Sequence, residues 1–404
     1  MTYDPFSAAF KADPWPVYRH LRDNQPVFHS EKWGFWALSR FDDVRAAARD
    51  HETFLSFEGI DVDDTAKDMS SPGFLPDIDN PRHDQLRRIV QRSFLPRTIA
   101  KLEDDVRRVI AGLVDRFADA GTADLAQDLS WPIPYAVFFD VLGLPTTGSD
   151  REDLVRWSHG LKDRENDDPR LTPVAWAALH NTKDYLAAVL NERRRAPRED
   201  LLSTLAGASV EDHDGVPYAP GPIDRDSEIV GLAFVLFMAG VESTSALLST
   251  AFRELARHPD QRRKLVADPS LIPAAVEESL RFDAPLQVSG RTTGRAVELH
   301  GVTIPAGERV FLIHGSANRD ERQFDDPDSF DVFRAPKRHM SFAEGLHGCL
   351  GAPLARLEAR IALEVALPRL GDYTISGPLR QYRSTPNMRV LDRLPISFAS
   401  GSHQ

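Results

Sequence analysis

The stretch HMSFAEGLHGCLGAPLARLEARIALEVAL, residues 339–367, contains Cys349, the only cysteine among 404 residues. Gly345, Gly348 and Gly351 surround it, and glycine permits left-handed backbone or the close approach of a flat ligand. After Gly351, apolar residues recur at spacings of three and four, which predicts an amphipathic helix. Cys349 therefore precedes a helix N-terminus, where unpaired amides and the positive dipole end favour a thiolate over a thiol.

Three interpretations of Cys349 remain open from this loop alone. A lone cysteine is often buried and inert. A nucleophile with His347 as its base is a second possibility, although triad partners normally come from distant positions in a chain. A thiolate ligand of haem iron is a third, with the glycines letting the porphyrin lie against the backbone.

Composition narrows the class of protein. A net charge of −12 argues against a nucleic-acid-binding surface, and a single cysteine fits a reducing compartment. The N-terminus has no basic region followed by an apolar run, so no signal peptide is expected. The longest apolar run, residues 229–241, is too short to span a membrane. We therefore expect a soluble cytoplasmic protein that binds neither nucleic acid nor membrane.

Helical periodicity dominates the chain and predicts helices over residues 105–120 and 181–196. Strand-like runs are few and short: one lies near Trp36, and two others lie within residues 297–315 and 373–398. These patterns predict a mainly α fold with a small β component. The Pro- and Gly-rich residues 211–226 are expected to form a surface loop rather than a domain linker.

A long buried helix is predicted from an N-cap at Asp226 to about His258. Its apolar run gives way at Gly240 to Glu242 and the hydroxyl residues that follow it, which are costly to bury unless satisfied or used. Hydroxyls that bond back along the helix and a paired Glu242 would make this stretch structural. Alternatively, Gly240 and a bond from Ser243 towards Ala239 would open a groove for water or dioxygen, and Glu242 would supply protons.

Glu278 and Arg281 lie three apart on a predicted helix ending at Phe282, so their side chains should be neighbours. The same spacing occurs twice more in the chain and carries no function by itself. Arg334 is a candidate third member of this network.

Together these features resemble the cytochrome P450 family in its soluble bacterial form. The family's haem loop, F-G-x-G-x-H/R-x-C-x-G, matches residues 342–351, with Ala343 in place of the second glycine. Its oxygen-groove pattern, [A/G]-G-x-[D/E]-T, matches residues 239–243, with Ser243 in place of the usual threonine. Glu278, Arg281 and Arg334 resemble its structural E-x-x-R network.

The resemblance implies a single cytochrome P450 domain over residues 1–404 that holds haem b, with Cys349 as the ligand of the iron. It places the haem contacts at His83, Arg87, Ala239, Gly240, Arg291, Phe342, His347, Cys349 and Gly351, and proton delivery at Glu242 and Ser243, beside Thr244. It places the substrate pocket at Val235, Met238, Ala239, Leu286, Gln287, Asn387 and Met388, under a lid formed by the loop from Phe57 to Asp77.

The reaction implied is insertion of one oxygen atom of dioxygen into a C–H bond of a small or medium apolar substrate, by hydroxylation or oxidative dealkylation. Electrons are expected from a separate ferredoxin or flavodoxin and its reductase, docking through basic residues such as Arg97, Lys101, Arg107, Lys337 and Arg338. A peroxide-driven peroxygenase and a haem-based sensor remain as alternatives. A cysteine hydrolase, by contrast, would be colourless.

Overall fold

The computed structural model describes residues 2–61, 72–161, 163, 171–208, 223–224, 226–334, 337–381 and 387–399. Its helices are α1 (Ala8–Ala12), α2 (Trp15–Asn24), α3 (Phe41–Arg49), α5 (Arg82–Val90), α6 (Pro96–Ile99), α7 (Glu103–Asp115), α8 (Pro132–Leu142), α9 (Gly148–Gly160), α10 (Pro173–Arg195), α11 (Leu201–Ala206), α12 (Glu228–Arg257), α13 (Pro259–Ala267), α14 (Ile272–Phe282), α15 (His314–Ala317) and α16 (Ala352–Leu370). Its strands are β1 (Val27–Ser30), β2 (Phe35–Leu38), β3 (Phe54–Leu55), β4 (Thr122–Asp124), β5 (Val288–Thr293), β6 (Val297–Leu299), β7 (Val302–Ile304), β8 (Arg309–Ile313), β9 (Tyr373–Ile375), β10 (Arg380–Gln381), β11 (Leu391–Arg393) and β12 (Pro395–Phe398).

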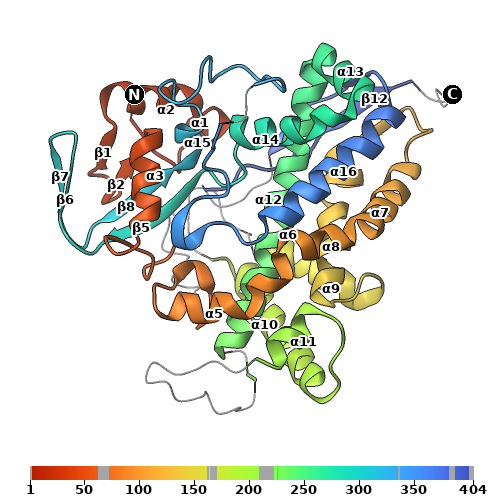
Figure 1. The fold of residues 1–404 in the computed structure, drawn as a ribbon, viewed down its shortest axis with the longest axis horizontal. Helices are drawn as coiled ribbons and strands as arrows, with labels where there is room; N and C mark the ends of the chain where they lie inside the picture. The colour runs from red at the N-terminus through yellow and green to blue at the C-terminus, as the bar shows by residue number, and fades with distance from the viewer. Residues whose placement is uncertain are drawn as a thin grey trace.

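Helix α12 forms the centre of the helical part (Figure 1) and packs against α8, α10, α14 and α16. It begins one residue later than predicted, because the Ser227 hydroxyl, and not Asp226, caps it by accepting a hydrogen bond from the Val230 amide. Within the described residues it is the one helix long and apolar enough to cross a membrane, but most of that apolar stretch is buried inside the fold. It is therefore the core helix that the apolar run predicted.

A five-stranded sheet lies to one side of the helices (Figure 1), in the order β1-β2-β8-β5-β3. β2 and β8 pair in parallel, and the other neighbours are antiparallel. The strand-like runs near Trp36 and within residues 297–315 are confirmed as β2 and as β6 to β8. Strand β5 was not predicted: it is buried along its whole length, so its sequence shows no polar alternation.

Other elements differ from expectation at their ends. The helix predicted over residues 105–120 ends at Asp115, after which the chain turns until Gly121, whose φ is +71°. Residues 181–196 fall within the longer α10 and its C-cap. Most of the predicted surface loop at residues 211–226, and residues 62–71 of the predicted lid, lie outside the described residues.

Candidate active site

The cysteine loop closes on itself immediately before α16. The amide of Cys349 donates to the carbonyl of Phe342 at 2.8 Å, and the amide of Gly348 donates to that of Gly345 at 3.1 Å. Cys349 is exposed, yet protein surrounds much of its sulfur, and this burial raises the pKa of the thiol. The amides of Gly351 and Ala352 pull the pKa in the opposite direction, as a helix N-terminus should. The predicted effect of the helix end on the thiolate therefore has the expected direction and is opposed by burial.

The glycines of this loop serve different purposes. Gly345 has a φ of +72°, and a Cβ there would lie 2.5 Å from the carbonyl oxygen of Ala48 at the end of α3. The absence of a side chain at Gly345 therefore makes room for the end of α3 and not for a ligand. A Cβ on Gly351 would meet nothing within 4 Å. Ala343, where the resemblance expects glycine, has a φ of +52°, which L-residues other than glycine rarely adopt.

Two histidines meet beside the loop. His83 of α5 and His347 lie with ring centroids 4.7 Å apart, and Nε2 of His347 is hydrogen-bonded to the Ser56 hydroxyl at 2.9 Å. Burial and the charge of Arg291 lower the pKa of His347 to about 2, so this imidazole is neutral. Nδ1 of His83 contacts Asp84, but its Nε2 is buried without a hydrogen-bond partner. Buried nitrogens are normally hydrogen-bonded, so a polar group that is not part of this chain is expected to bind here.

A buried guanidinium lies in the same region. Arg291 on β5 is 3% exposed, and burial lowers its pKa to about 10. Its Nη1 donates to the Gly290 carbonyl at 2.6 Å, and no carboxylate among the described residues forms an ion pair with it. Arg87 instead holds the cysteine loop, donating to the carbonyls of Leu346 and Gly348 at 3.2 and 2.7 Å. The unpaired cation and the orphaned His83 nitrogen fit the carboxylates of a buried haem.

The middle of α12 faces open space on one side. Ala239 is exposed and Ser243 half-buried, in a helix that is otherwise almost wholly buried. The Ser243 hydroxyl donates to the Ala239 carbonyl at 2.8 Å, as expected. The helix itself is unbroken, however, and a Cβ on Gly240 would lie 2.3 Å from the ring of Phe138. Gly240 thus permits close packing of α8.

Glu242 and Thr244 point away from that space into the protein. Thr244 is 4% exposed and Glu242 is 5% exposed. Glu242 is close enough to Tyr135 of α8 for its charge to add to burial in raising the pKa of the Tyr135 phenol. The Tyr135 hydroxyl is in turn hydrogen-bonded to Ser158. Of the predicted catalytic residues Glu242, Ser243 and Thr244, Ser243 is therefore the one that faces the open side.

The predicted substrate residues lie on three segments, two of which are directly joined. Leu286 and Met388 form an isolated β-bridge and are half-buried, as is Met238, whereas Val235 is buried. The amide nitrogens are engaged by the protein: Gln287 Nε2 donates to the Ala284 carbonyl at 2.6 Å, and Asn387 Nδ2 to Asp61 at 2.5 Å. The Oε1 of Gln287 is buried without a hydrogen-bond partner. What this region leaves accessible is apolar.

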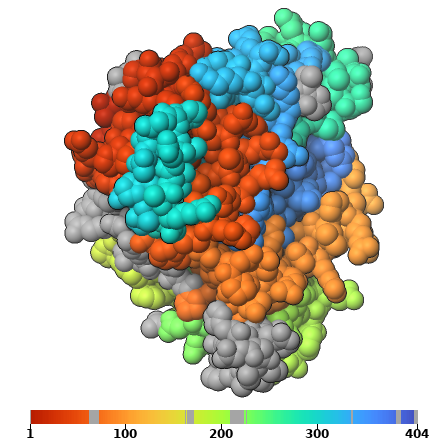
Figure 2. All heavy atoms as spheres, turned by 60° about the vertical axis from the view of Figure 1, so that its left-hand side comes forward, coloured from red at the N-terminus to blue at the C-terminus, as the bar shows by residue number. Residues whose placement is uncertain are grey.

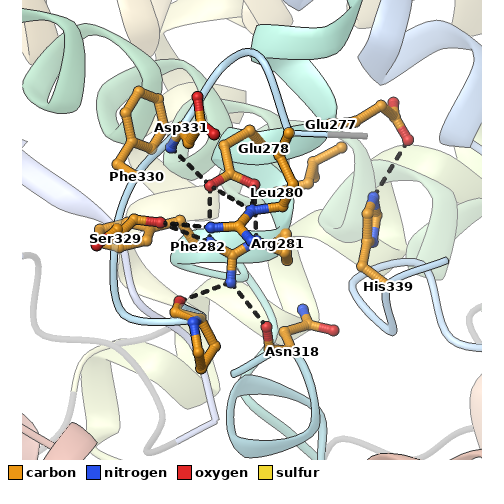
Figure 3. A network of polar contacts seen from close by, with 12 residues as sticks. Glu277, Glu278, Leu280, Arg281, Phe282, Asn318, Ser329, Phe330, Asp331 and His339 are labelled. Atoms are coloured by element: carbon orange, nitrogen blue, oxygen red, sulfur yellow. Dashed lines mark hydrogen bonds and ion pairs between the residues drawn. The ribbon is translucent and has the colours of Figure 1, made fainter. Parts of the chain in front are cut away.

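Glu278 and Arg281 lie at the centre of a network that ties α14 to residues 318–331 (Figure 3). Arg334 belongs to the same network. Glu278 and Arg281 share two contacts of 2.7 Å, and Arg334 approaches Glu278 at 3.3 Å. Arg281 also donates to the carbonyls of Asn318, Pro327 and Ser329. A buried ion pair with its remaining donors satisfied in this way fixes geometry more than it adds stability.

Ser56 and Phe138 contribute to the site but were not predicted. Ser56 holds His347, and Phe138 fills the space above Gly240. Each acts across more than 100 positions in the chain, so no local pattern marks them. In the contact between Phe138 and Gly240, only the glycine stands out in the sequence, because it interrupts an apolar helix.

Comparisons with known proteins agree with this geometry. The family model described as Cytochrome P450 matches residues 35–370. The erythromycin C-12 hydroxylase of Saccharopolyspora erythraea is 38% identical over 95% of this chain and 94% of its own. The vitamin D(3) 25-hydroxylase of Pseudonocardia autotrophica is 35% identical over 99% and 97%. Among solved structures, a mutant of P450 EryK in complex with erythromycin B has a TM-score of 0.84 at 36% identity, covering 98% of both chains. The Bacillus subtilis cytochrome P450 PksS has a TM-score of 0.87 at 29% identity, covering 98% of this chain and 100% of its own.

Proposed function

Because the chain belongs to the cytochrome P450 family, and is therefore a haem b monooxygenase, we propose that it inserts one oxygen atom of dioxygen into a C–H bond of a small or medium apolar substrate. We propose further that residues 1–404 act as one domain fed with electrons by a separate ferredoxin or flavodoxin. The observation that carries the proposal is the buried cation Arg291, which has no ion pair among the described residues and whose charge acts on His347, two residues before Cys349.

Haem b, when bound, supplies the redox chemistry that activates dioxygen. Cys349 is the proposed ligand of its iron, and the amides of Gly351 and Ala352 stabilise the thiolate form. Arg291 has an unpaired cation and His83 an unpartnered Nε2, and these two groups would hold the propionates of the haem. Arg87 acts through the carbonyls of the loop and holds it in place, as a positioning residue.

Proton delivery falls to α12. The Ser243 hydroxyl donates its hydrogen bond to the Ala239 carbonyl. Its oxygen can therefore accept a hydrogen bond from a water on the open side of the helix. Glu242, one residue earlier, is the proposed source of protons from the protein interior near Tyr135. In this arrangement Ser243 orders the water on the open side of α12, and Glu242 is the proposed proton donor on the interior side of the same turn.

The accessible parts of Met238, Leu286 and Met388 support an apolar substrate. Hydroxylation is the better supported outcome, because relatives of this chain are named as hydroxylases of vitamin D(3) and of erythromycin. The amide nitrogens of Gln287 and Asn387 are already used within the protein and are not free to bind a polar group of the substrate.

The first test is the absorption spectrum of the reduced protein with carbon monoxide. Thiolate ligation predicts a strongly red-shifted Soret band that is lost in Cys349→Ala. A wild-type protein that takes up no haem would overturn the proposal.

A second test separates the alternatives. A monooxygenase consumes dioxygen in a substrate-dependent way when a ferredoxin and its reductase supply electrons. A peroxygenase turns over faster with hydrogen peroxide than with ferredoxin, and a sensor shows no substrate-dependent consumption at all.

A further inference from the structure

Two buried hydroxyls join helices α8 and α9. Tyr135 of α8 is 3% exposed, and its hydroxyl is hydrogen-bonded to that of Ser158 on α9. The Ser158 hydroxyl also donates to the Val155 carbonyl at 2.9 Å. A hydroxyl has one proton to donate, so in this arrangement Tyr135 donates to Ser158 and the phenol oxygen can still accept a hydrogen bond. The two hydroxyls therefore form a short chain through the protein interior.

The packing of α8 against α12 brings the inner end of this chain to the acid of α12. Phe139 and Phe237 lie with ring centroids 5.8 Å apart. Phe138 lies against Gly240, so the contacts run in opposite directions along the two helices, which lie side by side in Figure 1. Tyr135 is one turn before the two phenylalanines on the same face of α8. It therefore faces the turn of α12 that follows Gly240.

Glu242 belongs to that turn and is 5% exposed. Burial raises the pKa of the Tyr135 phenol, the charge of Glu242 raises it further, and the charge of Arg151 on α9 lowers it. The phenol is therefore protonated at neutral pH and has a proton to donate. A carboxylate and a phenol placed in this way are suited to exchange a proton through a bridging water.

The outer end of the chain lies at the surface of α9. Ser158 is 9% exposed, and His159 beside it is half-buried. The His159 ring lies 6.0 Å from the ring of Tyr135 and 5.1 Å from that of Trp131. Figure 2 shows a face on which α5 to α7, in orange, lie beside the blue α16 segment. The chain of hydroxyls uses neither of these segments and opens to solvent at α9.

We propose that Tyr135 and Ser158 form the route by which protons from solvent at α9 reach Glu242, with one water bridging the phenol and the carboxylate. Neither residue touches substrate or haem in this proposal. Both act through Glu242, so they are positioning residues for the proton that it delivers. This inference rests on the proposed function, because Glu242 is the proposed proton donor of that reaction.

The route moves one proton and no electron. After Glu242 has given up its proton, Tyr135 turns its O–H from Ser158 towards the bridging water, which protonates the carboxylate and takes the phenol proton in return. Ser158 then turns its own O–H from the Val155 carbonyl to the phenol oxygen and takes a proton from a hydronium ion at the surface of α9. One O–H bond forms on Glu242, one breaks in solvent, and both hydroxyls end as they began.

The test uses variants of the holoprotein that remove single hydroxyls. Tyr135→Phe and Ser158→Ala each break the route and keep the surrounding packing. Tyr185→Phe is the matched control, because the Tyr185 hydroxyl also contacts α9, at Asp150, but lies outside the route. Glu242→Gln, alone and combined with Tyr135→Phe, completes the set. Each variant is compared only after its reduced carbon monoxide spectrum shows full haem loading.

The first readout is the infrared band of the protonated Glu242 carboxyl, identified by its loss in Glu242→Gln. Rapid mixing into D₂O at acid pH shifts this band as a deuteron replaces the proton. The exchange should be about tenfold slower in Tyr135→Phe and in Ser158→Ala than in the wild type, and unchanged in Tyr185→Phe. If the two hydroxyls only hold the helices together, their loss loosens the interface and makes the exchange faster.

The second readout is dioxygen consumption without added substrate, driven by a saturating plant-type [2Fe–2S] ferredoxin and its reductase in H₂O and in D₂O. Tyr135→Phe and Ser158→Ala should lower the rate and increase the solvent isotope effect. In the Glu242→Gln background, Tyr135→Phe should have no further effect, because the route has already lost its inner end.

Exchange at the wild-type rate or faster in Tyr135→Phe and Ser158→Ala overturns the route, as does equal slowing in Tyr185→Phe. Additive effects of Tyr135→Phe and Glu242→Gln on dioxygen consumption overturn it as well. These outcomes leave the proposed function standing, because the carbon monoxide spectrum is intact in all of them. Absence of that spectrum in the wild type overturns the proposed function instead.

Discussion

Ala343 carries the clearest backbone strain at the site. Its φ of +52° places an L-residue in the left-handed region, six residues before Cys349. There the Cβ crowds the following carbonyl, at a cost of roughly 1–2 kcal/mol. Glycine would remove that cost. It would also make the unfolded chain more flexible, which lowers the stability of the folded protein by about 0.4–1 kcal/mol.

Ala343→Gly should therefore stabilise the holoprotein by about 0.5–1 kcal/mol. The free energy of unfolding in urea measures it, with Ala46→Gly as control. Ala46 is an exposed residue within α3, where the same substitution should cost about 0.5–1 kcal/mol. Equal destabilisation by the two changes would show that Ala343 is not strained.

Ser243 is the other residue at which the chain departs from its family's pattern. Ser243→Ala removes the hydroxyl that faces the open side of α12, so the product formed per dioxygen consumed should fall severalfold and released peroxide should rise. Ser243→Thr keeps the hydroxyl and adds a methyl that restricts χ1, so its coupling should equal or exceed that of the wild type. Full coupling in Ser243→Ala would remove Ser243 from the proton path.

At the scale of the element, α16 contains a buried acid that the mechanism does not use. Glu358 is 1% exposed, its Oε2 has no hydrogen-bond partner, and burial alone raises the pKa of its carboxyl well above the usual value. The folded protein therefore keeps a neutral acid where the unfolded chain ionises. Such a group costs nothing below the unfolded pKa and progressively more as the pH rises above it.

Glu358→Gln should accordingly stabilise the protein relative to wild type by an amount that grows with pH, by up to about 1.4 kcal/mol per unit. Urea unfolding at pH 5, 6 and 7 measures the difference. Glu364→Gln, which removes a carboxylate paired with Arg360 on the same helix, should show a constant difference over that range. Parallel curves for Glu358→Gln and wild type would mean that Glu358 is ionised in the fold.

Elements with a strong local pattern were predictable, and those defined by distant contacts were not. Helix α12 was predicted to within one residue at each end, because its apolar run and polar ends are local features. Strand β5 was missed, although it carries Arg291, because burial on both faces removes the alternation that marks a strand. The role of Arg291 was inferred only through the resemblance.

The same division holds within the site. The Cys349 loop and the bond from Ser243 to Ala239 could be anticipated from spacing and residue type. The contact of Gly345 with Ala48 could not, because it joins segments almost 300 residues apart. Nor does the sequence show that Lys337 is already paired, which decides whether it is available to a partner.

At the scale of the molecule, the proposed haem site joins three distant parts of the chain. His83 comes from α5, Arg291 from the sheet and Cys349 from the loop before α16, and the first two hold buried polar groups suited to the haem carboxylates. A ligand that binds only the folded state stabilises it, by about 4 kcal/mol at a thousandfold excess over its Kd. Haem should therefore stabilise this region more than the rest.

Removal of haem should lower the free energy of unfolding by about that amount and loosen the fold locally. Hydrogen exchange of the haem-free chain should lose protection first in α5 and in residues 342–351, whose polar groups then face one another without the carboxylates. Helices α7 and α10, which pack within the apolar core, serve as the internal reference. Uniform loss of protection across α7, α10 and α5 would show that haem supports the fold as a whole and not the junction between these segments.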